Sequence, residues 1–490
     1  MDREAVAFAT ESRRWRASLS AARPVRFAAW ALLLLATSAA CTRQPPAVDL
    51  PAQPNLVLYL IDTLRADHLG CYGYALPVSP RIDAFARESV LVREARAQSS
   101  WTKPAVATIL TGLTPPGHGT ERRSHRLPKR VETLAERLGA AGYVTAMFTT
   151  NPTVTERFGF DQGFDEFHYL SQPRGRRRGH VDSAEIHEAV VEWLDRRSDG
   201  RPFFLVVHTL DPHDPYRPRE PFASRLAAGI DSESACCPKP AQLAGLTEAE
   251  LVERSRRSIA LYDAEIAQND ESFGRLRDEI ERRGLGPRTA ILLTADHGEE
   301  FFEHGGWRHG HALFEELLRI PFVLRLPGAA VAGRVVDGPI DQIDFTPTLL
   351  DLAGIAPADG LPGESWLPWL LGRGERPAGA ATSFAWLEHP AYSMAAAQAE
   401  GWKWIGRWGR GDDPPAPPAE WLFDLARDPA ETAPAGSVGG GGSADDADGH
   451  RRELVALLAA ARRQAGSAMA AEEEEIDPEL DRTLRALGYI

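Results

Sequence analysis

Cysteine is scarce in this chain. Only four occur in 490 residues, and only Cys71, Cys236 and Cys237 lie beyond the N-terminal segment. They form no CxxC pair and no ligand spacing of a structural zinc site. Cys236 and Cys237 are adjacent, and disulfide geometry does not readily allow them to bridge each other. A cysteine-bound zinc and a dense disulfide framework are therefore excluded, while one disulfide in an oxidising compartment stays open.

Positive charge is also in deficit. The chain carries 55 Lys and Arg against 69 Asp and Glu, a formal net charge of −14. Proteins that bind nucleic acid present a clustered basic face, so this balance argues against a nucleic-acid partner. The one basic run, RGRRRGH at residues 174–180, is either a solvated loop or an anion-binding patch.

Long apolar runs are missing except near the N-terminus. RFAAWALLLLATSAAC is too short for a confident membrane span, follows an Arg-rich leader and ends at Cys41. SAAC resembles the processing site of bacterial lipoproteins, and SRRWRA resembles a twin-arginine export signal. We therefore expect a leader over residues 1–41 and export to the bacterial periplasm or cell surface. Cys41 would carry the lipid that anchors the protein to the membrane; an uncleaved membrane anchor is the alternative.

The remaining chain alternates strand-like and helix-like segments. Apolar runs of strand length occur at NLVLYLID, YVTAMFTT, RPFFLVVHTL, TAILLTAD and IPFVLRLPG, with amphipathic helical segments between them. This alternation predicts an α/β fold with a mostly parallel central sheet flanked by helices. We expect a tether over 42–54, a catalytic domain over 55–375, a small C-terminal antiparallel sheet over 376–432, a disordered linker over 433–450, and a helix and tail over 451–490.

Carboxylates and histidines stand at the ends of these apolar runs. Asp62 follows the first run, and the pair Asp296 and His297 follows the fourth. The segments HTLDPHDPY and EHGGWRHGH add His208, Asp211, His213, His304, His309 and His311. Because the carboxyl ends of parallel strands meet at one edge of a sheet, we expect these side chains to cluster there. Singly, a strand-end aspartate often caps a helix. Together they predict a divalent-cation site with an open coordination position.

The segment SSWTKPAVATILTG, residues 99–112, predicts the start of a helix. Pro104 fits a first helical turn, where a missing N–H is tolerated. Thr102 then lies just ahead of a helix N-terminus, a position that favours an anion. Thr102 is therefore either a cap of this helix or a nucleophile.

The motifs follow one another in an order that resembles a known family. From the N-terminus the chain reads LIDTLRADHLGCYG, SSWTKPAVATILTGLTPPGHG, LDPHDPY, TADHGEE and WRHGHALFEELLRIPFVLRLPG, followed by IDQIDFTPTLLDLAG, LFDLARDPAET and the terminal LGYI. The series resembles the sulfatase-like members of the alkaline phosphatase superfamily. The resemblance implies a parallel sheet between helices, a smaller C-terminal sheet domain and metal-assisted attack on an ester of a tetrahedral oxyanion.

The resemblance also assigns roles to individual residues. Asp62, Asp296 and His297 match metal ligands, and Thr102 matches the nucleophile, which would also contact the metal. His213 matches a histidine that reaches the substrate or leaving group, and His309 or His311 falls near a substrate-binding lysine of sulfatases. The remaining candidates for substrate binding are Lys103, Asn151 and Asp211.

Departures from the family pattern alter the expected chemistry. Thr102 replaces the cysteine that sulfatases oxidise to formylglycine, and Ala105 and Val106 replace the Ser and Arg of CxPSR. Because threonine cannot follow the cysteine route, the interpretation is a metal-activated threonine acting on phosphate or phosphonate esters rather than sulfate esters. A sulfatase without formylglycine and a non-catalytic anion-binding member are the alternatives.

The expected metal and substrates follow from the same residues. Carboxylate, histidine and hydroxyl ligands favour one Zn²⁺ or Mn²⁺, with Ca²⁺ as another candidate. A two-metal site would need Asp211, His213 and His311 as further ligands. The substrate is expected to be an ester of a small molecule, a glycan or a lipid headgroup.

Overall fold

The computed structural model describes residues 49–171, 181–232, 240–243, 245–357, 359–377, 382–409, 419–435, 444–465 and 471–486. Cys41 and the leader, the basic run 174–180, the two adjacent cysteines and the terminal LGYI lie outside these residues. Within the described ranges, no helix has the length and apolar character needed to cross a membrane.

An eight-stranded sheet forms the centre of the main domain. Its order is β11-β2-β10-β7-β1-β6-β4-β5. The strands are β1 (Asn55–Ile61), β2 (Val90–Arg96), β4 (Val144–Thr149), β5 (Glu166–Tyr169), β6 (Phe203–Thr209), β7 (Thr289–Ala295), β10 (Arg319–Arg325) and β11 (Arg334–Asp341). Neighbours are parallel except at β10, which is antiparallel to both β2 and β7. The predicted α/β class with a mostly parallel sheet is confirmed.

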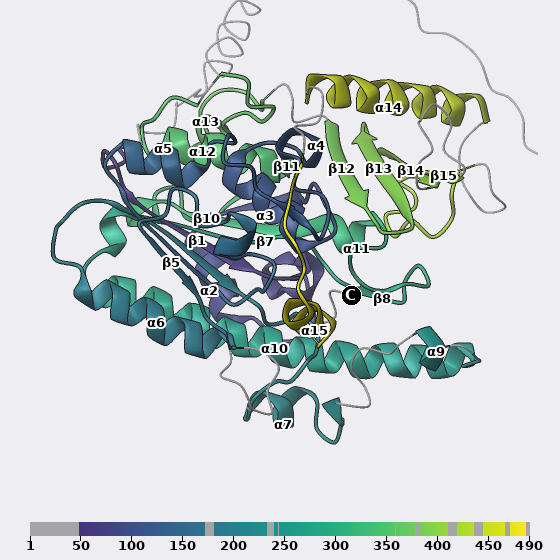
Figure 1. Cartoon of the computed structure of the whole chain (residues 1–490), viewed down its shortest axis with the longest axis horizontal. Helices are drawn as coiled ribbons and strands as arrows, with labels where there is room; N and C mark the ends of the chain where they lie inside the picture. Colours follow the sequence, from purple (N-terminus) through teal and green to yellow (C-terminus); the bar gives the residue numbers. More distant parts are fainter. Residues whose placement is uncertain are drawn as a thin grey trace, which may run out of the picture. The chain divides into compact units, whose positions relative to one another are not determined.

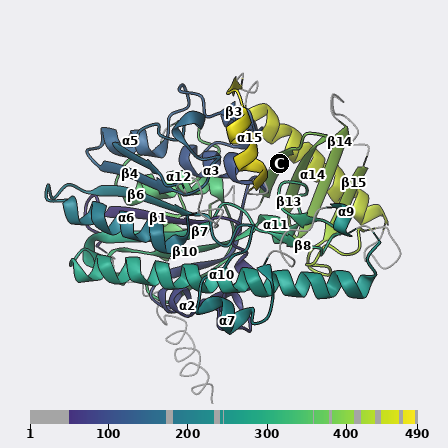
Figure 2. The ribbon, with the colours of Figure 1, turned by 60° about the horizontal axis from the view of Figure 1, so that its bottom comes forward.

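Helices cover both faces of this sheet. In Figures 1 and 2, α6 and α10 run along one face, and α3, α5 and α12 lie on the other. The longer helices are α2 (Pro80–Arg87), α3 (Thr102–Thr111), α5 (Leu134–Ala140), α6 (Ser183–Arg196), α10 (Glu248–Arg282) and α12 (Phe345–Leu352). Capping boxes at Thr133, Asp182 and Thr247 begin α5, α6 and α10. Short helices are α4 (Pro115–His118), α7 (Phe222–Leu226), α9 (Pro240–Leu243), α11 (Glu315–Leu318) and α13 (Leu367–Leu370).

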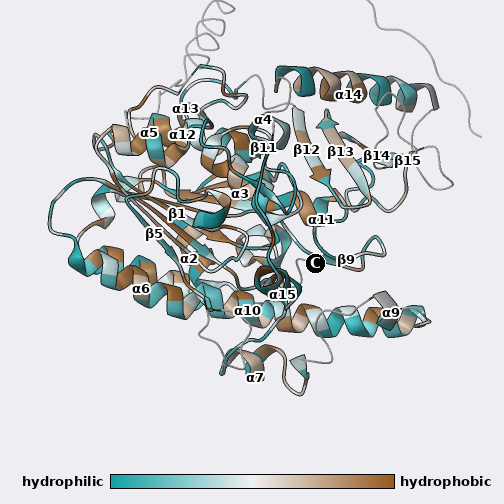
Figure 3. Cartoon of the chain, viewed as in Figure 1, coloured by the Kyte–Doolittle hydropathy of each residue, from teal (hydrophilic) through white to brown (hydrophobic). Residues whose placement is uncertain are grey.

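A separate antiparallel sheet follows in the C-terminal part of the chain. It contains β12 (Thr382–Glu388), β13 (Tyr392–Ala399), β14 (Trp402–Gly409) and β15 (Ala419–Asp424), in that order. Leu454 and Leu458 of α14 (Ala444–Gln464) pack with Trp404 and Trp408 of the sheet. The banded hydropathy of α14 in Figure 3 matches this one-sided burial. The small antiparallel sheet is as predicted, although α14 already begins inside the segment expected to be a linker.

Four further short strands lie among the described residues. β8 (Glu300–Phe301) pairs with β9 (Trp307–Arg308), and β3 (His125–Arg126) pairs with β16 (Glu472–Glu473) near the C-terminal helix α15 (Pro478–Ala486).

The pairing of the central strands sets the position of the predicted site. Ile61 at the end of β1 pairs with Ala295 of β7 on one side and with Thr209 of β6 on the other. The residues that follow these positions therefore leave the sheet next to one another. Asp62 and Asp296 are such residues, so their side chains meet at the carboxyl edge of the sheet as predicted.

A charged junction links the main domain to the small sheet. The buried ammonium of Lys403 lies 3.0 Å from Glu315 Oε1 and 2.8 Å from Glu431 Oε1. Beside it, His304 Nδ1 lies 2.8 Å from Glu316 Oε1, and His304 Nε2 lies 3.1 Å from the carbonyl oxygen of Glu431. Both ring nitrogens of His304 face acceptors, which is the arrangement of a protonated imidazole.

This arrangement predicts a pH-dependent stability. Burial lowers the pKa of His304, but the hydrogen bond and charge of Glu316 outweigh it and raise the pKa from 6.5 to about 9. The contribution of His304 to the free energy of unfolding is therefore complete below pH 6.5 and is lost as the pH rises through 9. We expect a loss of about 1–2 kcal/mol over this window, measured by urea unfolding.

Two variants test the assignment. His304→Gln should flatten the loss of stability between pH 6.5 and 9. His168→Gln should leave it unchanged, although His168 also contacts a glutamate, at 3.2 Å from Glu166 Oε2. If His304→Gln loses as much stability between pH 6.5 and 9 as the wild type, another group causes the pH dependence.

Candidate active site

Asp62 is the first acid of the site and is completely buried. Its Oδ2 accepts a hydrogen bond of 2.5 Å from the Asn151 side-chain amide and lies 3.6 Å from His208 Nε2. Burial by itself would raise the pKa of Asp62. The charges of His213, His208 and His297 outweigh burial and hold this pKa well below its usual range. Asp62 is therefore a carboxylate at neutral pH.

Asp296 is the second acid and is equally buried. Its Oδ1 accepts hydrogen bonds from the backbone N–H groups of Thr63, at 3.1 Å, and His297, at 2.9 Å. Burial, together with the negative charge of Asp62, raises the pKa of Asp296 to about 6. In the absence of a cation, the charged Asp62 therefore repels a second negative charge on Asp296.

The donor atoms between these acids fit a divalent cation. Asp62, His208 and Asp296 offer ligand atoms that all lie within 4.8 Å of one another. Among the described residues, Asp62 Oδ1, Asp296 Oδ2 and His208 Nε2 are buried without a hydrogen-bond partner. Buried polar atoms without partners are costly, and a cation would satisfy all three. His297 Nε2 lies 3.4 Å from Asp296 Oδ2 and 3.8 Å from Asp62 Oδ1, at the edge of this group, where its lone pair can either bind the cation or accept a proton, not both.

Thr102 lies beside this group at the start of α3. The residue is completely buried, and its Oγ1 is 3.3 Å from His297 Nε2. The N-cap of α3 is Trp101, so Thr102 is already the first helical residue and does not serve as the cap. His297 Nδ1 is 2.8 Å from the carbonyl oxygen of Gly298, to which it donates in the tautomer that leaves Nε2 as an acceptor facing the hydroxyl.

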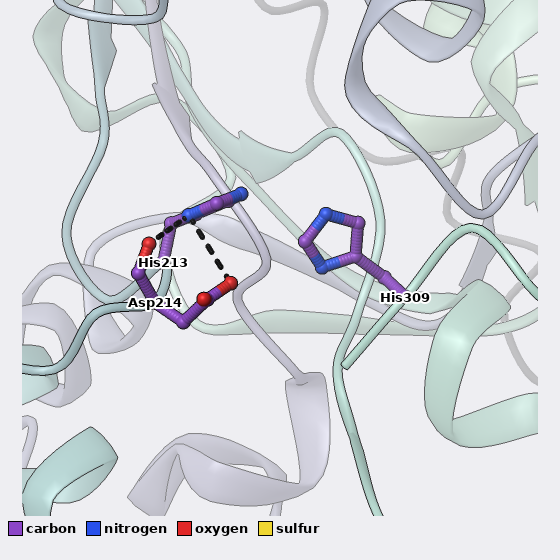
Figure 4. Close-up of side chains that lie close together, drawn as sticks. All are labelled: His213, Asp214 and His309. Atoms are coloured by element: carbon purple, nitrogen blue, oxygen red, sulfur yellow. Dashed lines mark hydrogen bonds and ion pairs between the residues drawn. The ribbon is translucent and has the colours of Figure 1, made fainter. Parts of the chain in front are cut away.

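Two more histidines, His213 and His309, lie close to each other and to Asp214, as Figure 4 shows. His213 Nδ1 lies 2.5 Å from the carbonyl oxygen of Asp214, and its ring centroid is 4.8 Å from that of His309. The His309 ring is in turn 4.5 Å from that of His297. His309 Nδ1 is held by Glu299 Oε1 at 2.8 Å. The structure therefore brings His213 and His309 together with His297.

The two histidines differ in charge. Burial lowers the pKa of His309 well below its usual value, and the positive charges of His297 and His213 lower it further. Burial also acts on His213, but the negative charges of Asp62 and Asp214 outweigh it and raise its pKa. His309 is therefore a neutral imidazole at neutral pH, whereas the surroundings of His213 favour its protonated form.

Four of the predicted substrate-contacting residues make hydrogen bonds within the fold, and one of them, His311, also lines the cavity beside His309. Asn151 uses its amide nitrogen to hold Asp62. Asp211 Oδ1 accepts from the N–H of Ser183 at 2.8 Å, at the start of α6. His311 Nε2 is bound by Glu300 Oε2 at 2.7 Å. The Lys103 ammonium is buried and donates to the carbonyl oxygens of Arg123, at 2.5 Å, and His125, at 3.1 Å.

The contacts of Lys103 predict a structural effect on substitution. Lys103→Met should lower the free energy of unfolding by about 1–3 kcal/mol, because two buried carbonyl groups lose their donor. Urea unfolding measures this change. Affinity for an anionic ester should change little, since the ammonium is engaged within the fold. A KM raised strongly in Lys103→Met with stability unchanged would instead support the predicted role in substrate binding.

A cavity of about 380 Å³ lies next to these histidines. His309 and Trp101 line its inner side, and Trp307 and Arg308 line another part of it. Arg308 Nη2 is 3.0 Å from Asp214 Oδ2, so the same loop that bears His309 also contacts the segment of His213. Arg308 adopts a φ of 73°, a left-handed conformation that is rare for a residue with a side chain. The cavity therefore adjoins the histidines of the candidate site.

Two members of the site, Asp214 and Arg308, were absent from the predicted residues, and a third, His208, was predicted without a specific role. Asp214 and Arg308 gave no signal beyond their place in the motifs LDPHDPY and WRHGH. His208 was a candidate in HTLDPHDPY but was not assigned as a ligand. His208 lies near the end of the apolar run that forms β6. Because β6 pairs with β1, this position lies next to Asp62.

Comparison with known proteins identifies the family. The family model "Sulfatase" matches residues 54–355, and "N-sulphoglucosamine sulphohydrolase, C-terminal" matches residues 302–435. An ulvan-active sulfatase of Formosa agariphila is 27% identical over 382 residues, covering 71% of this chain and 70% of that protein. An N-acetylglucosamine-6-O-sulfatase of Bacteroides thetaiotaomicron is 24% identical over 451 residues, covering 74% and 79%.

Solved structures share the fold. The structure of the protein BT4656, in complex with its substrate D-glucosamine-2-N,6-O-disulfate, superimposes with a TM-score of 0.69 at 22% identity. The match covers 84% of this chain and 98% of BT4656. The phosphonate monoester hydrolase of Agrobacterium radiobacter gives a TM-score of 0.67 at 23% identity, covering 84% and 96%. Since the sulfatase model spans more than half of the 490 residues, this chain belongs to the sulfatase family, within the alkaline phosphatase superfamily.

Proposed function

We propose that this protein is a metal-dependent hydrolase of esters of tetrahedral oxyanions, with the hydroxyl of Thr102 as the nucleophile. The observation that carries the proposal is the placement of this hydroxyl. It lies at the N-terminal end of α3, 3.3 Å from His297 Nε2. The buried, unpartnered oxygens Asp62 Oδ1 and Asp296 Oδ2 belong to the same group of side chains.

The metal would be held by Asp62, Asp296 and His208, with His297 beside them. A bound divalent cation supplies positive charge that lowers the pKa of a neighbouring hydroxyl and polarises a substrate oxygen. Mixed oxygen and nitrogen donors suit Zn²⁺ or Mn²⁺ better than Ca²⁺, which prefers oxygen ligands. We retain a single Zn²⁺ or Mn²⁺ as the proposed cofactor.

Residues of the chain itself supply the other steps of the proposed reaction. His297 Nε2 accepts the proton of the Thr102 hydroxyl as Thr102 Oγ1 bonds to the sulfur or phosphorus atom. The bond from that atom to the leaving oxygen breaks, and His213 delivers a proton to this oxygen. The N-terminal turn of α3 stabilises negative charge on the oxyanion. A water molecule afterwards displaces Thr102 and regenerates the hydroxyl.

Sulfate esters are the first substrate class to test, because the reported curated relatives are sulfatases. Phosphonate monoesters are the second. Thr102 favours them, because a simple hydroxyl lacks the second oxygen with which an aldehyde hydrate expels sulfate. The comparisons do not support a preference for phosphodiesterase chemistry over sulfate-ester hydrolysis. We propose a small-molecule, glycan or lipid-headgroup ester as the natural substrate.

The test is an assay of the purified chain on 4-nitrophenyl sulfate and 4-nitrophenyl phenylphosphonate. The chain is first freed of metal with a chelator and then supplied with Zn²⁺, Mn²⁺ or Ca²⁺. The proposal expects turnover of at least one ester that disappears on chelation and returns with one of the ions. Undiminished turnover in the metal-free chain would contradict metal dependence, and no turnover of either ester would contradict the activity.

A variant of His213 tests the proton donor. His213→Gln should lower kcat/KM by about 10²–10⁴-fold for an alkyl ester, whose leaving oxygen needs a proton. The loss should be much smaller for a nitrophenyl ester, whose leaving group departs as an anion. His389→Gln, in the wall of the same cavity, should affect both esters alike. Equal losses for both esters in His213→Gln would remove His213 from this role.

The location of the protein is a separate proposal. We propose that the chain is exported and held at the membrane by a lipid on Cys41. Replacing Cys41 with serine should move the protein from the membrane fraction to the soluble fraction. Unchanged membrane association in Cys41→Ser would contradict the lipid anchor.

A further inference from the structure

The C-terminal tail, residues 471–486, folds back onto the main domain. Its strand β16 pairs with β3, with Glu472 opposite Arg126 and Glu473 opposite His125. The N–H of Glu474 then donates to the carbonyl oxygen of Ser124 at 2.6 Å. Figure 2 shows β3 beside α15, the last helix of the tail. This tail lies beyond both ranges matched by the family models, which end at residue 435.

Ion pairs hold the tail in place. Arg157 Nε lies 3.2 Å from Glu474 Oε1, and Arg157 Nη1 lies 2.6 Å from Asp477 Oδ2. Arg126 and Arg130 add longer pairs with Glu472, at 3.9 and 3.6 Å. The acidic run of the tail is thus matched to arginines of the main domain. These opposite charges offset one another.

Ile476, which lies between Glu474 and Asp477, lines the cavity beside the active site. Ile476 lines the cavity of about 380 Å³ together with His309, Trp101 and the loop of residues 122–124. Within the tail, Ile476 packs against Leu484, which is buried. The tail therefore contributes an apolar side chain to a cavity whose inner wall is a histidine of the active site.

We infer that the C-terminal tail forms one wall of the substrate cavity and that Ile476 is a specificity-determining residue, contacting the leaving group of the ester. The inference rests on the proposed function, because it places the organic part of that ester. The cavity is lined by His309, whose ring centroid is 4.8 Å from that of His213, so the organic substituent of an ester protonated by His213 would extend into it. The size of residue 476 then limits the size of the leaving group.

The first experiment compares two leaving groups in the full chain. The ester class that the wild type hydrolyses is offered with a one-ring nitrophenol and a two-ring methylumbelliferone leaving group. Ile476→Trp should raise KM for the two-ring ester about tenfold with little change in kcat, and Ile476→Ala should reduce the discrimination between the two. Glu475→Ala, an exposed neighbour, is the control and should leave both KM values unchanged. Unchanged KM values in both Ile476 variants overturn the inference.

The second experiment measures the docking of the tail without catalysis. The double variant Glu474→Gln with Asp477→Asn should speed amide hydrogen exchange in residues 122–127 about tenfold, because β16 is no longer held against β3. It should also raise KM for the two-ring ester. Unchanged exchange in this variant overturns the docking by ion pairs.

Exchange also separates the inference from the proposed function. If no ester is hydrolysed, 4-nitrophenyl sulfate is added as a binding probe and exchange is followed in residues 472–477 and 307–311. Slower exchange in both segments would support the inference that the tail forms a wall of the cavity, even though the proposed activity is contradicted. Slower exchange at 307–311 alone overturns the wall, and no change in either segment overturns both.

Discussion

Thr102→Ala should lower kcat by about 10⁴-fold or more, because the hydroxyl that attacks the ester is removed. The folded structure should survive, since Thr102 is the first residue of α3 and not its cap. Thr102→Ser keeps the hydroxyl and should retain measurable turnover. Steady-state kinetics with the hydrolysed ester measures each change, and the bound metal should be analysed alongside.

A second buried threonine of the same helix provides the control. Thr111→Ala removes a hydroxyl that donates to the carbonyl oxygen of Ala107 at 2.7 Å, remote from the acids of the site. It should cost about 1 kcal/mol of stability and leave kcat unchanged. Mass spectrometry after rapid quenching should find the transferred group on Thr102 of the wild type. Wild-type turnover in Thr102→Ala would exclude it as the nucleophile.

Asp296→Asn should abolish metal binding and lower kcat by about 10³-fold or more, while making the metal-free protein more stable. The amide keeps an oxygen for the N–H groups of Thr63 and His297. Only the unpartnered Oδ2 is replaced. The folded-state pKa of Asp296 is about 6, against an ordinary 3.8, so its charged form is disfavoured by folding.

The sign of the stability change follows from these values. The metal-free wild type loses stability as the pH rises from 3.8 to 6, because Asp296 then becomes charged in the unfolded chain while it stays protonated in the folded state. At pH 7.5, the metal-free variant should therefore be more stable by about 1–3 kcal/mol. Added metal should stabilise the wild type by about 2.7 kcal/mol at a hundredfold excess over Kd and leave the variant unchanged. Urea unfolding with and without a chelator measures both differences.

Asp270→Asn is the control for Asp296→Asn. It tests whether replacing any buried carboxylate would have the same effect on stability and metal binding. Asp270 is also buried, and burial raises its pKa to about 7. Its two oxygens accept from the N–H groups of Arg81 and Ile82, so the amide loses one acceptor. This variant should lose stability but keep the metal and the activity. A metal-free Asp296→Asn that is less stable than the wild type would contradict the repulsion between the two acids.

The sheet and the acids of the site were predictable because their signals are local. Continuous apolar runs predict strands buried on both faces, and Asp62 and Asp296 follow such runs directly. The strand β2 was missed because its sequence VLVREAR places charged side chains in its second half. β11 was missed because it contains Gly338 and Pro339, which interrupt the apolar pattern. Both strands lie toward the edge of the sheet, where such residues are tolerated.

The roles of polar side chains were less predictable because they depend on distant partners. Lys103 follows Thr102 in sequence, yet helix geometry directs its ammonium to the carbonyl groups of Arg123 and His125. Asn151 was expected at the substrate, and only the parallel pairing of β4 with β6 brings it to Asp62. The partner of such a residue is set by strand order, which a single sequence does not specify.

The separation of the proposed metal ligands along the chain has a consequence for folding. Thr63 and Asp296, which share a hydrogen bond at the site, are 233 positions apart, and β6 supplies His208 from between them. An unfolded chain cannot hold three such distant ligands around one ion, because closing both loops costs too much conformational entropy. The cation should therefore enter only after β1, β6 and β7 have paired. Metal uptake would then mark the completion of the sheet, and the rate of uptake would report the slowest step of its assembly.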